Sequence, residues 1–171
     1  MGRILEAITE YLSDEFGADG LEPDEDTIAF RFADDDTDDE WGCLAVAIEE
    51  ADQMMFYSVR LLPVPEERRD AVMLFITRAN YGMHVGNFEM DLDDGEVRFK
   101  TAMDVEDTDI SATMCRNLVE VNLAVMGRYI AGLAAVADDG QDPIAVLAGI
   151  EDDGDDDGDD DDDSDDSDDD A

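Results

Sequence analysis

The side chains that could carry out nucleophilic or acid–base chemistry are few in this sequence. His84 is the only histidine, so a Ser-His-Asp or Cys-His relay would have to use it, and it lies in a loop-like segment, residues 81–86. The two cysteines, Cys43 and Cys115, are far apart, and neither has a cluster of Lys and Arg or a second His beside it to lower its thiol pKa. We therefore expect no catalytic site, and two structural thiols in a protein of the reducing cytosol.

The Asp-rich segments are the other candidates for chemistry, as metal sites. Residues 153–158 begin like an EF-hand calcium loop, but the twelfth position, which should be a bidentate Glu, is Ser164. Residues 34–40 contain no Gly and suit a solvated loop between strands. Gly82 and Gly86 suit a helix cap and a loop better than a phosphate-binding turn. We expect no metal, no cofactor and no enzymatic activity.

The charge of the chain excludes several classes of partner. Its 171 residues include 50 acids and 10 bases, for a net charge of -40. Residues 151–171 contain 16 of the acids and no base, which leaves about -24 on the rest of the chain. Nucleic-acid phosphates and anionic membranes are bound by clustered Lys and Arg, so we expect neither nucleic acid nor membrane as a partner. Residues 151–171 cannot bury apolar surface, and we expect a disordered tail there.

The stretch from Asn87 to Met103 predicts a β-hairpin. Asp94 and Gly95 favour a two-residue type I′ turn, because that turn needs a positive φ at both central positions. Folding at this turn pairs apolar residues on one face: Leu92 with Val97, Met90 with Phe99, and Phe88 with Thr101. On the other face it pairs opposite charges: Asp91 with Arg98, and Glu89 with Lys100.

Apolar periodicity predicts the remaining elements. Helices are expected at 3–16, 66–80 and 111–136, and a short final helix is expected with Asp142 as its cap and Pro143 as its first residue. Further strands are expected at 27–33, 41–49 and 54–62. Because every strand alternates, we expect an α+β domain with a five-stranded antiparallel sheet, helices on one face, and the order α-β-β-β-α-β-β-α. The predicted domain spans residues 1–137, and the short helix within 138–150 and the tail at 151–171 follow it.

The two middle strands have apolar residues on both faces, so their facing must be chosen. We assign one alternating set to the core face: Leu44, Val46 and Ile48 in one strand, and Met55, Tyr57, Val59 and Leu61 in the other. The outward face then contains Ala45, Ala47, Met54 and Phe56, beside Arg31 and Arg60. Apolar residues ringed by bases on an acidic body indicate a contact surface for a partner. The alternative is that a helix or the C-terminal segment covers this face in the monomer.

This order of elements, and residues 74–103 in particular, resembles the YbjN family. The residues that carry the resemblance are Leu74, Asn80, the run Gly86-Asn87-Phe88-Glu89, the run from Asp94 to Phe99, and Asn117, Leu118, Asn122, Arg128 and Tyr129 in the late helix. The resemblance spans roughly residues 3–136 and excludes the tail. It implies the fold of type III secretion chaperones and a non-enzymatic role; family members are called bacterial sensory-transduction regulators. Related domains bind peptides or partner proteins, commonly as dimers.

The sequence thus predicts a cytosolic, non-enzymatic, chaperone-like or regulatory module that binds a protein or peptide partner, with a homodimer as a further option. An alternative function is that the acidic tail does the binding, as a ligand for basic proteins or a nucleic-acid mimic. Deleting residues 151–171 separates the two: partner binding that survives the deletion belongs to the domain.

Overall fold

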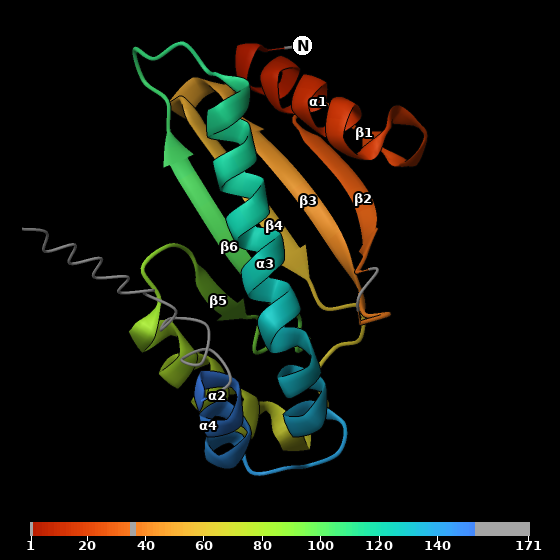
Figure 1. Cartoon of the computed structure of the whole chain (residues 1–171), viewed down its shortest axis with the longest axis vertical. Helices are drawn as coiled ribbons and strands as arrows, with labels where there is room; N and C mark the ends of the chain where they lie inside the picture. The colour runs from red at the N-terminus through yellow and green to blue at the C-terminus, as the bar shows by residue number, and fades with distance from the viewer. Residues whose placement is uncertain (1, 35–36, 153–171) are drawn as a thin grey trace, which may run out of the picture.

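An antiparallel sheet of six strands forms the centre of the computed structural model, which describes residues 2–34 and 37–152 (Figure 1). The strands are β1 (Glu22–Pro23), β2 (Thr27–Ala33), β3 (Glu40–Ile48), β4 (Gln53–Val59), β5 (Asn87–Met90) and β6 (Val97–Asp104), in the spatial order β1-β2-β3-β4-β6-β5. The predicted EF-hand-like stretch and the predicted disorder of the tail lie outside the described residues.

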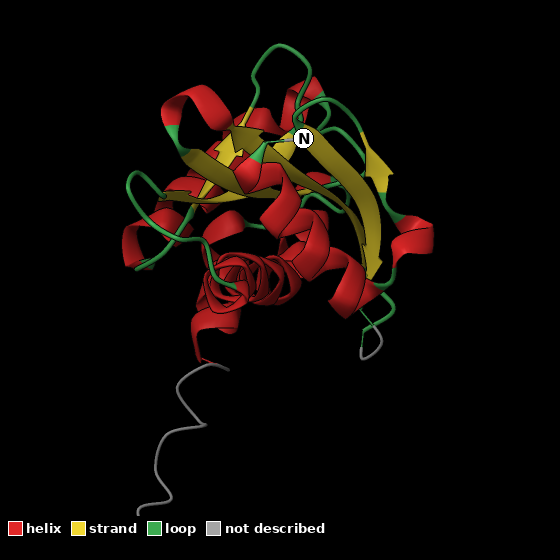
Figure 2. Cartoon of the chain, turned by 90° about the horizontal axis from the view of Figure 1, so that it is seen from above, coloured by secondary structure: helices red, strands yellow, loops and turns green. Residues whose placement is uncertain are grey.

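The long helices lie on one face of this sheet. They are α1 (Arg3–Phe16), α2 (Arg69–Gly82), α3 (Ala112–Ala137) and α4 (Pro143–Asp152), with short 3-10 turns η1 (Ala18–Gly20), η2 (Glu49–Ala51) and η3 (Glu66–Arg68). In Figure 1, α1 and α3 cross the same face of the sheet, and α2 and α4 lie together at its lower end; Figure 2, seen from above, shows α3 end-on beneath the strands. The predicted α+β architecture with an antiparallel sheet is confirmed.

The predicted number of five strands is wrong by one, because β1 is a separate strand. β1 is two residues long and pairs only with Ile28 and Ala29 of β2. A strand this short, ending in a proline, leaves no alternation for a sequence pattern to detect.

The hairpin of β5 and β6 has the predicted facing but a different register. Phe88 lies opposite Phe99 and Met90 opposite Val97, so the register is shifted by two residues from the prediction. Gly95 has a φ of +86°, but a Cβ at this position would lie 2.3 Å from the Val64 carbonyl oxygen. The Gly95 carbonyl accepts a hydrogen bond from the Val64 amide at 2.8 Å. The glycine therefore allows a wider loop to approach Val64, rather than forming a two-residue turn.

The predicted facing of β3 and β4 is wrong. Ala45, Ala47, Met54 and Phe56 are 0–2% exposed and belong to the core, whereas Leu44, Val46, Met55 and Val59 are half-buried on the opposite face. Both faces of these strands are apolar, so hydrophobicity alone cannot choose between them. The small residues of β3 lie inward, where α1 packs against this strand, so the helix can approach the sheet closely.

Helix α3 anchors the helical layer to the sheet. Asn122 is fully buried, and its Nδ2 donates hydrogen bonds to the carbonyl oxygens of Phe56 (2.9 Å) and Phe99 (3.2 Å). By length and composition alone, α3 is the one helix within the described residues that could cross a membrane. Its buried stripe, which includes Val119, Met126 and Leu133, packs in the core, and this packing accounts for its apolar composition.

Candidate functional site

The six residues predicted to form a contact surface do not share one. Ala45, Ala47, Met54 and Phe56 lie in the core beneath the helices. Arg60 is 7% exposed; it forms an ion pair with Asp138 and donates a hydrogen bond to the Leu62 carbonyl oxygen. Arg31 alone is exposed on the outer face of the sheet. These residues therefore cannot act together as an exposed binding surface.

The two cysteines and the single histidine, whose side chains are the most reactive in the chain, lie in environments that do not favour nucleophilic chemistry. Cys43 and Cys115 are buried free thiols, and burial raises the pKa of Cys43 to about 12. Both thiols are therefore protonated at neutral pH and poor nucleophiles. His84 is exposed in the loop between α2 and β5. Within residues 2–34 and 37–152, no group of three or more His, Cys, Asp or Glu could hold a metal ion.

The two lateral edges of the sheet differ in how their backbone groups are paired. β1 covers only Ile28 and Ala29 of β2, so within the described residues Phe30–Ala33 have a strand on one side only. The Asp26 carbonyl accepts from Ala47 of β3 at 2.9 Å, and the Thr27 carbonyl accepts from Asp24 on the opposite side at 2.8 Å. Alternate residues of an antiparallel strand direct their backbone groups to the same side. By this alternation, the N–H and C=O groups of Arg31 and Ala33 point to the open side.

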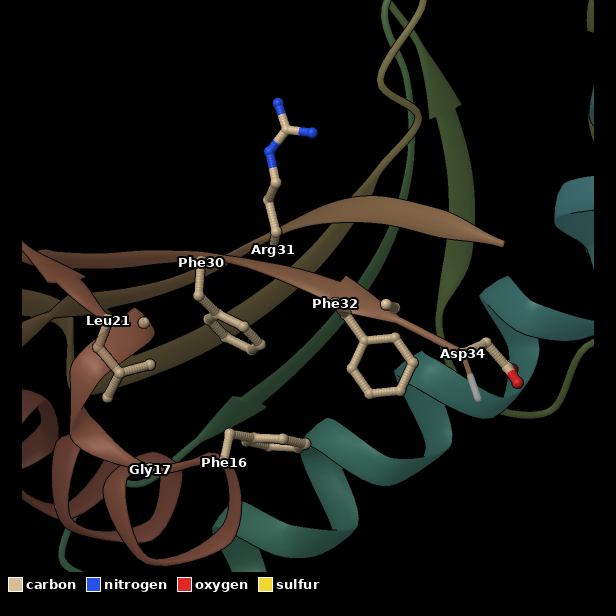
Figure 3. Close-up of a pocket in the computed structure, with 9 residues that line it drawn as sticks. Phe16, Gly17, Leu21, Phe30, Arg31, Phe32 and Asp34 are labelled. Atoms are coloured by element: carbon tan, nitrogen blue, oxygen red, sulfur yellow. The ribbon is translucent and has the colours of Figure 1, made fainter. Parts of the chain in front are cut away.

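A hollow of about 550 Å³ lies beside this open part of β2 (Figure 3). Phe16 at the end of α1 stacks on Phe30 (ring centroids 5.5 Å apart) and lies edge-on to Phe32 (6.1 Å). Leu21 and the glycines at 17 and 20 complete the wall on the α1 side. Figure 3 shows the rings of Phe30 and Phe32 directed toward Phe16, while Arg31 extends from the opposite face of β2. We call this feature the aromatic hollow.

The local sequence explains why the edge and the hollow stay open. α1 ends at Gly17, which has a φ of +80°, a conformation that suits glycine, and its amide donates to the Ser13 carbonyl at 3.1 Å. Between Gly17 and β1, only Leu21 has a large apolar side chain. The chain pairs with β2 over two residues and therefore does not cover Phe30–Ala33.

Sequence reasoning missed this site, although its signals are present. Alternation placed Phe30 and Phe32 correctly on the inner face of β2, and helical spacing placed Phe16 on the inner face of α1. What the pattern could not show is that the next strand is too short to cover β2. A short Gly-rich connection after α1, followed by a single Pro-containing pair, is the only sequence signal for an open edge.

Two comparisons with known proteins bear on this arrangement. A family model matches residues 6–135: YbjN, described as "Putative bacterial sensory transduction regulator". The chain is also similar to a chain of the "Crystal Structure of the ExsC-ExsE Complex", with 12% identity and a TM-score of 0.52, covering 75% of this chain and 94% of that chain. This likeness shows the fold.

A further similarity is to a chain of the "Structure of the HopA1-SchA Chaperone-Effector Complex", with 11% identity and a TM-score of 0.48, covering 71% of this chain and 88% of that one. That value is too low to add to the argument. No curated protein sequence matches the chain.

Proposed function

Since this chain belongs to the YbjN family, we propose that it is a non-enzymatic, chaperone-like module that binds a protein partner. We propose further that it binds an extended segment of that partner, which adds as a strand to β2 and places apolar side chains in the aromatic hollow. The observation that carries the proposal is the open edge of β2 beside a hollow lined by three phenylalanines.

Strand addition uses both parts of this site. Main-chain hydrogen bonds to Arg31 and Ala33 would provide affinity that does not depend on the partner's sequence. Because side chains of a strand alternate between faces, every second residue of the added strand would point toward Phe30 and Phe32. Those positions would provide specificity, since an apolar side chain gains about 25 cal/mol per Å² that it buries there.

The fold is compatible with this role, because the similar chain was solved in a complex of two proteins. The cytoplasmic location expected from the sequence belongs to the same proposal. The expected homodimer is a special case of it, in which a second copy supplies the added strand. The rival proposal, binding through the acidic tail, predicts that removal of residues 151–171 abolishes binding.

A proline at the open edge tests the proposal. The probe is a fluorescently labelled nonapeptide of alternating Val and Thr, flanked by two residues at each end that are Ser, Lys or Glu in three versions. Its anisotropy reports binding. Ala33→Pro removes an N–H that no strand of the described residues uses, so the fold should lose only about 0–1 kcal/mol of stability. Ala33→Ser keeps the N–H and is the matched control.

We expect at least one peptide version to bind the wild type and the Ala33→Ser variant, and Ala33→Pro to weaken that binding at least about tenfold. Light scattering on the same samples registers self-association; a dimer lost only in Ala33→Pro would identify a second copy as the source of the strand. Failure of all three versions to bind, with no dimer, would contradict the proposal. Equal binding by Ala33→Pro would contradict it as well.

A further inference from the structure

Carboxylates surround the open edge at both ends. No Lys or Arg occurs between Arg3 and Arg31, and that interval contains nine acids. Asp19 lies between the two glycines that line the aromatic hollow, and Glu22 follows Leu21; both acids are exposed. At the other end, Asp34 directly follows β2 and lines the hollow.

The one base of β2 does not neutralise the carboxylates beside the hollow. Arg31 is in the strand itself but leaves from the face opposite the hollow, as Figure 3 shows. Arg116 lines a different hollow, with Glu10 and Asp14 of α1, and its Nε lies 3.9 Å from a Glu120 carboxylate oxygen. A segment lying along the open edge therefore meets an apolar centre with negative charge at each end.

We propose that the segment accepted by this edge is cationic and apolar: an extended strand with an alternating apolar core and Lys or Arg at both flanks. This inference rests on the proposed function and states which class of partner the same site selects. Lys and Arg fit because their apolar stems can lie against the rims of the hollow while their charges reach the carboxylates. Opposite charges also steer the encounter and disfavour wrong partners.

The acidic tail of this chain does not suit this site as an occupant. Residues 153–171 contain only Asp, Ser, Gly and one Ala, so they offer no side chain for the aromatic hollow and the wrong charge for its rims. Like charges brought together at an interface disfavour the contact.

The three peptide versions defined above test the inference. At 0.1 M salt we expect the Lys-flanked peptide to bind about three- to tenfold more tightly than the Ser-flanked one, and the Glu-flanked peptide to bind most weakly. At 1 M salt, where the Debye length falls from about 10 Å to about 3 Å, the three affinities should converge. Trp41, the single tryptophan, packs on Phe32 (ring centroids 4.8 Å apart), so its fluorescence should change only on binding at the hollow.

Two matched charge variants separate local from overall charge. The triple variant Asp19→Asn, Glu22→Gln, Glu25→Gln removes three negative charges from the segment between α1 and β2, in exposed positions. The control Glu66→Gln, Glu67→Gln, Asp70→Asn removes three exposed charges around the start of α2, at the other end of the molecule (Figure 1). We expect the first variant to lose the preference for Lys flanks and the control to keep it.

The outcomes are distinguishable. Binding of all three versions with equal affinity at low salt overturns the inference but leaves the proposed function intact. Tightest binding of the Glu-flanked version also overturns it, as does an equal loss of preference in the two triple variants. If none of the three peptide versions binds and no dimer forms, the proposed function itself is contradicted, as stated above.

Discussion

The two edges of the sheet, at β5 and at β2, differ in whether their outward-facing backbone groups have hydrogen-bond partners. At the β5 edge, Asn80 of α2 occupies the place of a missing strand: its Oδ1 accepts from the Phe88 amide at 2.7 Å, and its Nδ2 donates to the Phe88 carbonyl at 3.0 Å. One side chain thus reproduces the pair of hydrogen bonds that a neighbouring strand would make. At the β2 edge, the residues of the α1–β1 connection that line the hollow are Gly17, Gly20 and Leu21, and none of their side chains can make such bonds.

Because of this difference, the edge at β5 is blocked, whereas the edge at β2 is available for pairing with another chain. An unpaired strand edge is a template for pairing with another chain, and proteins normally cover or shorten it. β5 is both short and covered. β2 remains open next to a hollow that can hold side chains. Within the described residues, the second half of β6 also has a strand on one side only, β4, but its exposed residues there are Ala102 and Asp104, which offer a bound strand little apolar surface.

The largest effect is expected at the sheet centre, between the two edges. Replacing Met54 and Phe56 together by Ser should unfold the protein, because both are 0% exposed and truncating a buried Phe alone costs about 3–5 kcal/mol. Far-UV circular dichroism and urea titration measure this. The control Met55→Ser, on the half-buried outer face, should retain the fold. A folded double variant would contradict the observed facing of β4.

Opening the closed edge should have the next largest effect. Asn80→Ala leaves the Phe88 N–H without a partner and leaves its C=O only the longer hydrogen bond from Asn87 at 3.4 Å, which should cost about 1–3 kcal/mol. Asn117→Ala, an exposed asparagine of α3, is the control and should change stability by less than about 0.5 kcal/mol. Urea denaturation of the two variants makes the comparison. Equal stabilities would mean that Asn80 does not close this edge.

The smallest effect is expected on the outer face of the closed edge. Burial would raise the pKa of the Glu89 carboxyl, but hydrogen bonds from Lys100 and Arg98 outweigh it and hold that pKa below the ordinary value of 4.5. A lowered pKa in the folded state stabilises the fold at pH values above that ordinary value, and the contribution disappears as the pH falls through the folded-state pKa.

Glu89→Gln should therefore be less stable than the wild type by no more than about 1 kcal/mol at pH 7, with the difference shrinking as the pH drops below 4.5. Urea titrations at several pH values measure it. A difference that grows on acidification would show that the ion pairs with Arg98 and Lys100 do not stabilise the fold.

The sequence predicted the parts of the fold that depend on local periodicity. The helices, the antiparallel strands and the inward facing of Phe88, Phe99 and Phe30 follow from spacing alone. The facing of β3 and β4 could not be predicted because Ala45 and Val46 both suit a strand, and only the approach of a helix selects the smaller residue. The register of β5 and β6 was missed because Gly95 serves a contact with Val64, which is distant in sequence.

The candidate site depended even more on tertiary structure. Arg31 was placed correctly on the outer face, since β2 alternates clearly. Asn80 was noted only through the family resemblance, and its role as an edge cap depends on where α2 lies. The open edge itself is a property of how far β1 extends, which no residue type of β2 encodes.

Amide hydrogen exchange, followed residue by residue in the presence and absence of the Lys-flanked peptide, tests the central claim most directly. If a partner strand adds to β2, the amides of Arg31 and Ala33 exchange rapidly in the free protein and become protected when the peptide binds, while Phe88 is protected in both states. Peptide binding that leaves Arg31 and Ala33 unprotected, or protection of these two amides already in the free protein, would contradict it.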